Sequence, residues 1–268
     1  MFEMFELLME EYPVAVYVFT FLFGLCVGSF LNVCIYRIPE NQSFVVVPSH
    51  CMTCNKKLHW YELIPLFSWL FLRGKCLGCK SKISAQYPLI ESANAVLWLI
   101  VLWAKGFSPD MFLYDALVSA LLVIAIIDYR TKEIPNGIVA FCLAVSVLHA
   151  VVDSFAYSDT WLDHILGGVV LGLIFFLVLF ISEGRALGGG DVKLMFAVGF
   201  FLGLKCGVLS IFIACLLGSV IHLALMKIKH LGRELAFGPY LAAGYAISAL
   251  WGQQILNWYF EKFISISF

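Results

Sequence analysis

Two aspartates, Asp128 and Asp191, stand at the ends of strongly apolar segments and are the residues best suited to chemistry. Asp128 closes the apolar run 121–128, and Asp191 follows the three glycines 188–190 at the start of another apolar segment. A carboxylate at a membrane boundary is costly unless it is solvated, paired or shares a proton. Two such acids at a similar depth predict a pair that shares one proton and activates water to hydrolyse a peptide bond.

Each aspartate also has a simpler explanation. Asp191 could merely begin a helix, where the helix dipole favours a carboxylate, and Asp128 could pair with a basic residue that follows it. The glycines favour catalysis, because glycine can adopt positive φ and lets another chain approach closely. A peptide substrate needs such a gap to lie extended beside the acids. We therefore expect Gly188 and Gly190 to line a substrate gap. One aspartate would act as base and the other as acid, in an order that the sequence does not assign.

A second candidate site consists of cysteines. Four of the nine cysteines form two CxxC pairs separated by 21 residues: Cys51, Cys54, Cys76 and Cys79. Two such knuckles supply four thiolates for a tetrahedral Zn²⁺ ion. Four ligands leave no open position, so the metal would be structural, and its binding would stabilise a loop with little core. A redox dithiol and free thiols remain as alternatives.

The composition defines the elements that must position these residues. The chain of 268 residues is 62% hydrophobic and 13% charged, which is typical of a polytopic membrane protein. The first apolar segment is expected to be a span and not a cleaved signal peptide, because its flank is acidic. We expect an all-α fold of about eight transmembrane helices, formed by residues 14–36, 88–104, 111–128, 136–152, 162–182, 191–204, 206–228 and 238–259.

The distribution of basic residues predicts the orientation. The connections 37–87, 129–135, 183–193 and 227–234 hold 14 of the 17 Lys and Arg residues, so they are expected to be cytoplasmic, with both termini outside. This orientation places both aspartates at the cytoplasmic ends of their helices. It also argues against disulfides, since the cytoplasm keeps thiols reduced. The basic residues form no face of their own, so we expect no nucleic-acid partner.

The predicted spans and loops divide the chain into three regions. They are a first transmembrane helix (1–36), a cytoplasmic zinc-binding domain (37–87) and a transmembrane protease bundle (88–268). Within the zinc-binding domain, the stretch 63–72 is apolar but too short to span, and is expected to pack on the membrane surface or on the zinc module. Pairs of glycines four residues apart predict close helix packing: Gly24/Gly28, Gly168/Gly172, Gly199/Gly203 and Gly203/Gly207.

The sequence resembles the bacterial type IV prepilin peptidases, which are aspartic proteases of the GxGD kind that act within the membrane. Asp128 stands in an Asp-x₆-Pro motif that ends at Pro135, and residues 188–193 fit the pattern GxGDxK. The paired CxxC knuckles match the family as well. Further similarity covers residues 28–39, 63–70, 83–91 and 237–244. Met52 departs from the pattern, because a proline often follows the first cysteine.

This resemblance implies a reaction. Members remove the basic leader of type IV prepilins and pseudopilins at the cytoplasmic face of the bacterial inner membrane, and such proteins serve pili and type II secretion. Many then methylate the new N-terminal residue with S-adenosylmethionine. The cysteine loop is associated with that second activity, so its presence favours the two-activity form. The sequence places neither the methyl-donor site nor the oligomeric state.

Other functions remain as alternatives. A leader peptidase without methyltransferase activity is the nearest of them. An ion-coupled transporter would place its acids near the middle of the membrane and would show paired halves. The acids here lie at one boundary and no internal repeat is evident. A scaffold built on the zinc module, without catalysis, is the remaining alternative.

Overall fold

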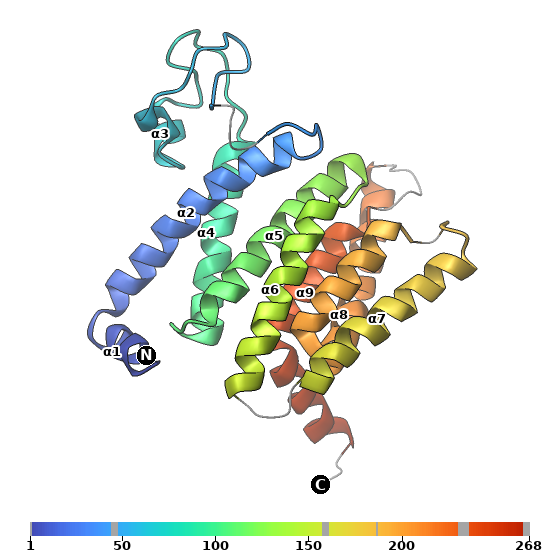
Figure 1. Cartoon of the computed structure of the whole chain (residues 1–268). Coiled ribbons are helices and arrows are strands. Elements are labelled where there is room, and N and C mark those ends of the chain that lie inside the picture. The colour runs from blue at the N-terminus through green and yellow to red at the C-terminus, as the bar shows by residue number, and fades with distance from the viewer. Residues whose placement is uncertain (1, 44–47, 157–160, 186, 230–235, 265–268) are drawn as a thin grey trace. The chain divides into compact units, whose positions relative to one another are not determined.

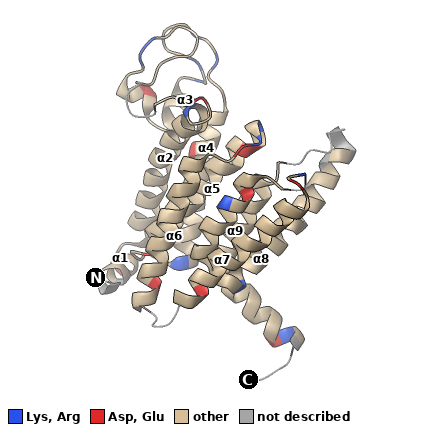
Figure 2. Ribbon diagram, turned by 45° about the vertical axis from the view of Figure 1, so that its right-hand side comes forward, with Lys and Arg blue, Asp and Glu red and all other residues tan. Residues whose placement is uncertain are grey.

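The computed structural model of the protein is helical and divides into two compact units, Met1–Met111 and Phe112–Phe268. Most Lys, Arg, Asp and Glu residues lie in loops and near helix ends, whereas the long helices are otherwise uncharged (Figure 2). The structure describes residues 2–43, 48–156, 161–185, 187–229 and 236–264.

The first unit is built on two long helices, α2 (Pro13–Arg37) and α4 (Gln86–Lys105), preceded by the short helix α1 (Phe2–Glu11) (Figure 1). Glycines let α2 approach α4. A Cβ atom added at Gly24 would lie 2.8 Å from the Cα of Ala95, and one at Gly28 would lie 2.7 Å from the Cα of Glu91. Asn94 donates a hydrogen bond to the carbonyl of Gly24 at 2.8 Å. The predicted close packing at this glycine pair is confirmed.

A loop between α2 and α4 carries the cysteines. It contains the short 3₁₀ helix η1 (Trp60–Leu63) and the five-residue helix α3 (Phe67–Phe71). Among the described residues, the β-structure of this loop consists of two isolated antiparallel bridges, which pair His50 with Lys57 and Lys75 with Lys82. Figure 1 shows α3 on one side of the loop, below its tip.

The second unit is a bundle of five helices. They are α5 (Met111–Thr131), α6 (Asn136–Ala156), α7 (Trp161–Ile181), α8 (Gly189–Lys229) and α9 (Gly238–Tyr259), followed by the short π-helical segment η2 (Phe260–Ile264). Helix α8 packs against α6, α7 and α9 and is the centre of this unit. Glycines again mark a contact, because a Cβ at Gly199 would lie 2.5 Å from the carbonyl oxygen of Gly167 on α7.

Helix α8 is broken at Gly203, where φ is 70° and ψ is 178°. Two residues of α7 compensate for the interrupted backbone. The amide of Leu204 donates to Asp163 Oδ1 at 3.3 Å, and His164 Nδ1 donates to the carbonyl of Phe200 at 2.7 Å. The break explains why the sequence predicts a short sixth span before a longer seventh one.

Replacement of Gly203 by alanine is expected to destabilise the second unit. The positive φ alone costs roughly 1–2 kcal/mol for a residue with Cβ, and the added Cβ would also collide with the side chain of Asp163. Gly106 provides a control, since its φ is 73° and no atom lies within 4 Å of an added Cβ. In thermal unfolding of the purified protein, Gly203→Ala should lower the Tm more than Gly106→Ala. Equal shifts would show that only the backbone torsion matters.

All eight predicted spans coincide with helical segments of the structure. Within the part of the chain that the structure describes, six helices are long and apolar enough to cross a membrane: α2, α4, α5, α6 as far as Phe155, α7 and α8 as far as Ala224. Helix α8 contains two of the predicted spans, and α9 is the helix predicted at residues 238–259, although it is not among the six. The protein is an all-α polytopic membrane protein, with its four-cysteine loop between the first and second spans.

Candidate active site and metal centre

Asp128 lies in the last turn of α5 and is 6% exposed. Its Oδ2 accepts a hydrogen bond of 2.8 Å from the amide of Gly238, the first residue of α9. The positive end of the α9 dipole is therefore directed at this carboxylate. A Cβ at position 238 would lie 2.6 Å from Asp128 Oδ2, so the contact requires glycine. Gly238 was not among the site residues predicted from the sequence.

Asp191 lies in the first turn of α8 and is 8% exposed. Its Oδ2 accepts a hydrogen bond of 3.1 Å from the amide of Gly188, and its own amide donates to the carbonyl of Gly188 at 3.2 Å. Asp191 therefore does lie at the start of a helix, where the helix dipole favours a carboxylate. That placement alone does not account for the burial of the carboxylate, or for its position close enough to Asp128 for the two charges to interact.

A third buried acid, Asp115, also lies on α5. It is 1% exposed, and neither carboxylate oxygen has a hydrogen-bond partner among the described residues. The rise of 1.5 Å per residue places it about 20 Å from Asp128 along the helix. Asp115 is therefore too distant to complete a pair with Asp128. Its position inside the apolar run 111–127 was the signal that could have marked it in the sequence.

The glycines before Asp191 differ in part from expectation. Gly189 and Gly190 begin helix α8, and none of residues 188–190 has a positive φ, so the freedom of glycine to adopt such torsions is not used here. Close approach is nevertheless present. A Cβ at Gly190 would lie 2.9 Å from the Cβ of Ile134, whereas one at Gly189 would meet no atom within 4 Å. Gly190 therefore lets the connection between α5 and α6 pack against the start of α8.

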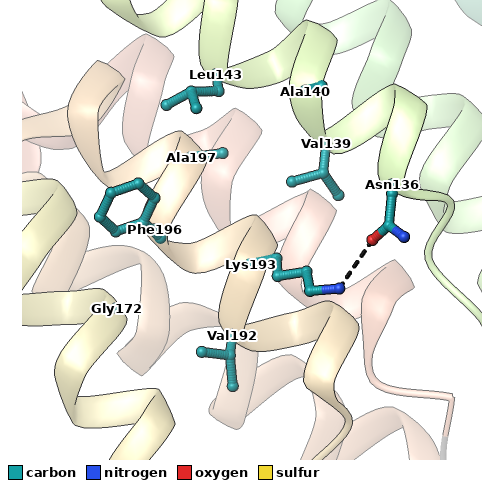
Figure 3. A pocket seen from close by; sticks show the side chains of 9 residues that line it. All are labelled: Asn136, Val139, Ala140, Leu143, Gly172, Val192, Lys193, Phe196 and Ala197. Carbon is teal, nitrogen blue, oxygen red and sulfur yellow. Dashed lines mark hydrogen bonds between the residues drawn. The ribbon is translucent and has the colours of Figure 1, made fainter.

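The motif lysine Lys193 points away from the aspartates. It follows Asp191 by two residues, and a rotation of about 100° per residue places it on the far side of α8. There its Nζ donates to Asn136 Oδ1 at 2.9 Å. The pair lies at the edge of a mainly apolar hollow of about 480 Å³ between α6, α7 and α8 (Figure 3). Lys193 thus joins the start of α6 to α8 and is not a neighbour of the Asp191 carboxylate.

The four cysteine sulfurs of the loop converge. The Sγ atoms of Cys51, Cys54, Cys76 and Cys79 all lie within 4.8 Å of one another. A tetrahedral Zn²⁺ ion with bonds of about 2.3 Å requires sulfurs about 3.8 Å apart, and the Sγ atoms of Cys51 and Cys79 are 3.9 Å apart. The donor set therefore fits a metal ion such as Zn²⁺.

Hydrogen bonds within the two knuckles position the cysteine ligands and change the pKa of their thiols. In the first knuckle the amide of Cys51 bonds to the carbonyl of Lys56 at 2.9 Å, and in the second the amide of Cys76 bonds to Ser81 at 2.9 Å. The amides of Cys54 and Thr53 donate to the Cys51 thiol and lower its pKa to about 6. A hydrogen bond from the Ser81 side chain lowers the pKa of Cys79. Both effects favour the thiolate form of these two ligands. The pKa of Cys54 is instead raised to about 11: the backbone hydrogen bond from Lys56 lowers it, but desolvation and the neighbouring cysteine sulfurs outweigh that effect.

These observations define a helical integral membrane protein with the buried acids Asp128 and Asp191 in one helical unit and, in the other, a cluster of four cysteines that could hold a metal ion. The chain belongs to the type IV leader peptidase family. Residues 22–105 match the bacterial peptidase A24 N-terminal domain, and residues 115–223 match the type IV leader peptidase family. The boundary between the two matches agrees with the boundary between the two compact units.

Relatives extend over almost the whole chain. This chain is 32% identical over 243 residues to a prepilin leader peptidase/N-methyltransferase of Bacillus subtilis (strain 168), and the aligned region covers 90% of this chain and 96% of that protein. A protein of the same name from Aeromonas hydrophila is 32% identical, covering 91% and 93%. One from Pseudomonas putida is 31% identical, covering 87% and 89%. No solved structure matches the chain.

Proposed function

We propose that this chain removes the leader peptide of type IV prepilins and pseudopilins, with Asp128 and Asp191 as the catalytic pair. The arrangement of the two carboxylates carries the proposal: both are buried, they lie at the end of α5 and the start of α8, and their charges interact. The relatives named prepilin leader peptidase/N-methyltransferase support the choice of substrate. The protein would lie in the bacterial inner membrane with both termini outside.

The proposed reaction needs one ionised and one protonated carboxyl group. The ionised group takes a proton from water while the water oxygen attacks the scissile carbonyl, and the protonated group gives its proton to the carbonyl oxygen. When the C–N bond then breaks, the leaving amine takes up the proton that came from water, and one hydroxyl of the diol returns its proton to the other carboxylate, which restores the starting pair. Gly238 and Gly188 each donate one amide hydrogen bond to this pair. Two interacting acids of this kind titrate together, so the proton is assigned to the pair.

The second proposed activity is N-methylation of the new N-terminal residue with S-adenosylmethionine. The names of the relatives and the four-cysteine loop support it. We propose that the loop holds a structural Zn²⁺ ion, because four thiolates leave no position for a substrate.

Co-expression of this chain with a prepilin tests both activities in one measurement. The intact mass of the prepilin should fall by the mass of the leader and rise by that of one methyl group. Cleavage without methylation would support the single-activity alternative. A prepilin that keeps its leader, while the chain is present in the membrane, would refute the proposed function.

The glycine contact gives a further prediction. Gly190→Ala should lower the rate of leader removal by at least about tenfold, because the new Cβ must displace Ile134 and shift the start of α8 with Asp191. Gly189→Ala is the matched control, since its Cβ enters open space. Both variants would be compared at equal abundance in membranes in a prepilin cleavage assay. Equal rates would mean that the contact between Gly190 and Ile134 does not position Asp191.

A further inference from the structure

The segment from η1 to α3 exposes an unusual amount of apolar surface. Helix α3 has no buried residue. Phe71 is 84% exposed and Leu70 is 53% exposed, and Phe67 is also exposed. At about 100° per residue these three side chains share one face of the short helix. Such a surface on an isolated loop would be a liability in water and indicates a contact with another apolar phase.

The opposite face of α3 is already used by the loop itself. Trp69 lies on that face and donates its indole N–H to the carbonyl of Ile83 at 3.2 Å. Its ring also covers Gly74, where a Cβ would lie 2.8 Å from the Trp69 ring. The loop therefore fixes the rotation of α3. Phe67, Leu70 and Phe71 are directed away from the segment that leads into α4.

Glu91 fixes the depth of α3. The amide of Leu66, directly before α3, donates to Glu91 Oε2 at 2.7 Å. Glu91 is the sixth residue of the membrane-spanning helix α4 and is 6% exposed. It lies about 7.5 Å along the helix from Gln86. The interfacial layer on each side of the hydrocarbon core is of similar thickness, roughly 5–7 Å. Leu66 and the start of α3 therefore lie at the depth of the lipid headgroups.

Charge complements this placement. The loop between α2 and α4 carries seven basic residues and two acidic ones over residues 37–87. One of the two acids, Glu62, is buried and paired with Lys56 at 3.3 Å. Arg73, Lys75 and Lys82 follow α3 and are exposed. A basic edge beside an apolar face is the pattern of segments that lie on anionic membranes.

We propose that α3 lies in the leaflet on the side of the four-cysteine loop, with Phe67, Leu70 and Phe71 among the lipid acyl chains and the basic residues against anionic headgroups. The occupant of the exposed apolar face is thus the protein's own bilayer. In this arrangement Glu91 and α3 hold the metal-binding knuckles at a fixed height above the membrane. The inference does not depend on the catalytic role of the aspartates.

Site-specific photocross-linking tests the proposal in the full-length protein. The photoreactive residue p-benzoylphenylalanine would replace Phe71 in one variant and Met52 in another. Met52 is a matched control, because it is 80% exposed but lies in the first knuckle. Each variant would be reconstituted in nanodiscs of phosphatidylglycerol and phosphatidylcholine in equal amounts, and lipid adducts would be counted by mass spectrometry after irradiation.

The proposal predicts at least about tenfold more lipid adduct at position 71 than at position 52, with phosphatidylglycerol in excess among the adducts. Equal adducts at the two positions, or cross-links at position 71 to another protein chain, would overturn the docking of α3 on the bilayer. Adducts that reflect only the lipid composition would overturn the role of the basic residues.

Discussion

Replacement of Asp128 or Asp191 by asparagine is expected to lower leader removal by roughly 10⁴-fold, the size of loss seen when an essential carboxylate of a protease is replaced by its amide. Asparagine keeps the shape of aspartate and can still accept the hydrogen bonds from Gly238 or Gly188. It can neither take up nor release the proton that hydrolysis requires. The folded state should therefore persist while the chemistry is lost.

Cleavage of a prepilin by purified variants in nanodiscs measures this effect. Glu183→Gln is the control, because Glu183 is an exposed acid between α7 and α8 that pairs with Arg185 and contacts neither aspartate. The control should retain the wild-type rate. Full activity of either aspartate variant would remove that residue from the catalytic pair.

The second large effect concerns the metal centre. Cys76 is the buried ligand, 2% exposed, and its replacement by serine should abolish metal binding and unfold the loop. Structural zinc contributes about 10–16 kcal/mol of binding free energy in zinc-finger peptides, far more than a loop with so little core can replace. Methylation is expected to fall more than cleavage, because the aspartates belong to the other compact unit.

Metal analysis and limited proteolysis of the same preparations check this prediction. Wild-type protein prepared without chelators should carry about one Zn²⁺ per chain. Cys76→Ser should carry none and should be cut in the loop. Cys26→Ser is the control, since Cys26 is exposed on α2 outside the cluster and should bind zinc normally. Wild-type protein without metal would refute the zinc centre.

The parts of the structure that depend on neighbouring residues could be predicted from the sequence. Apolar segments of sufficient length predicted the helices, because the bilayer sets their length. The spacing of the cysteines predicted the convergence of four sulfurs, since each knuckle is a local turn. The glycine pair on α2 also predicted close helix packing. Residues four apart lie on the same face of a helix, so Gly24 and Gly28 can be recognised as one contact surface from the sequence alone.

Features that depend on distant contacts were not predicted. Gly238 lies 110 residues from Asp128, and nothing in a Gly-Pro pair shows that its amide donates to the carboxylate of Asp128. The helix that starts at Gly189 uses ordinary torsions, so the freedom of glycine to adopt positive φ plays no part before Asp191. Gly190 is needed for space beside Ile134, and that contact becomes visible only when the chain is folded.

A double-mutant cycle tests whether Asp128 and Asp191 act as one catalytic unit. Leader removal would be measured for Asp128→Asn, Asp191→Asn and the double variant under single-turnover conditions. If the residues act together, the double variant should be no slower than either single one, because the first substitution already removes the shared function. Losses that multiply in the double variant would show that the two aspartates act independently and would contradict the proposed pair.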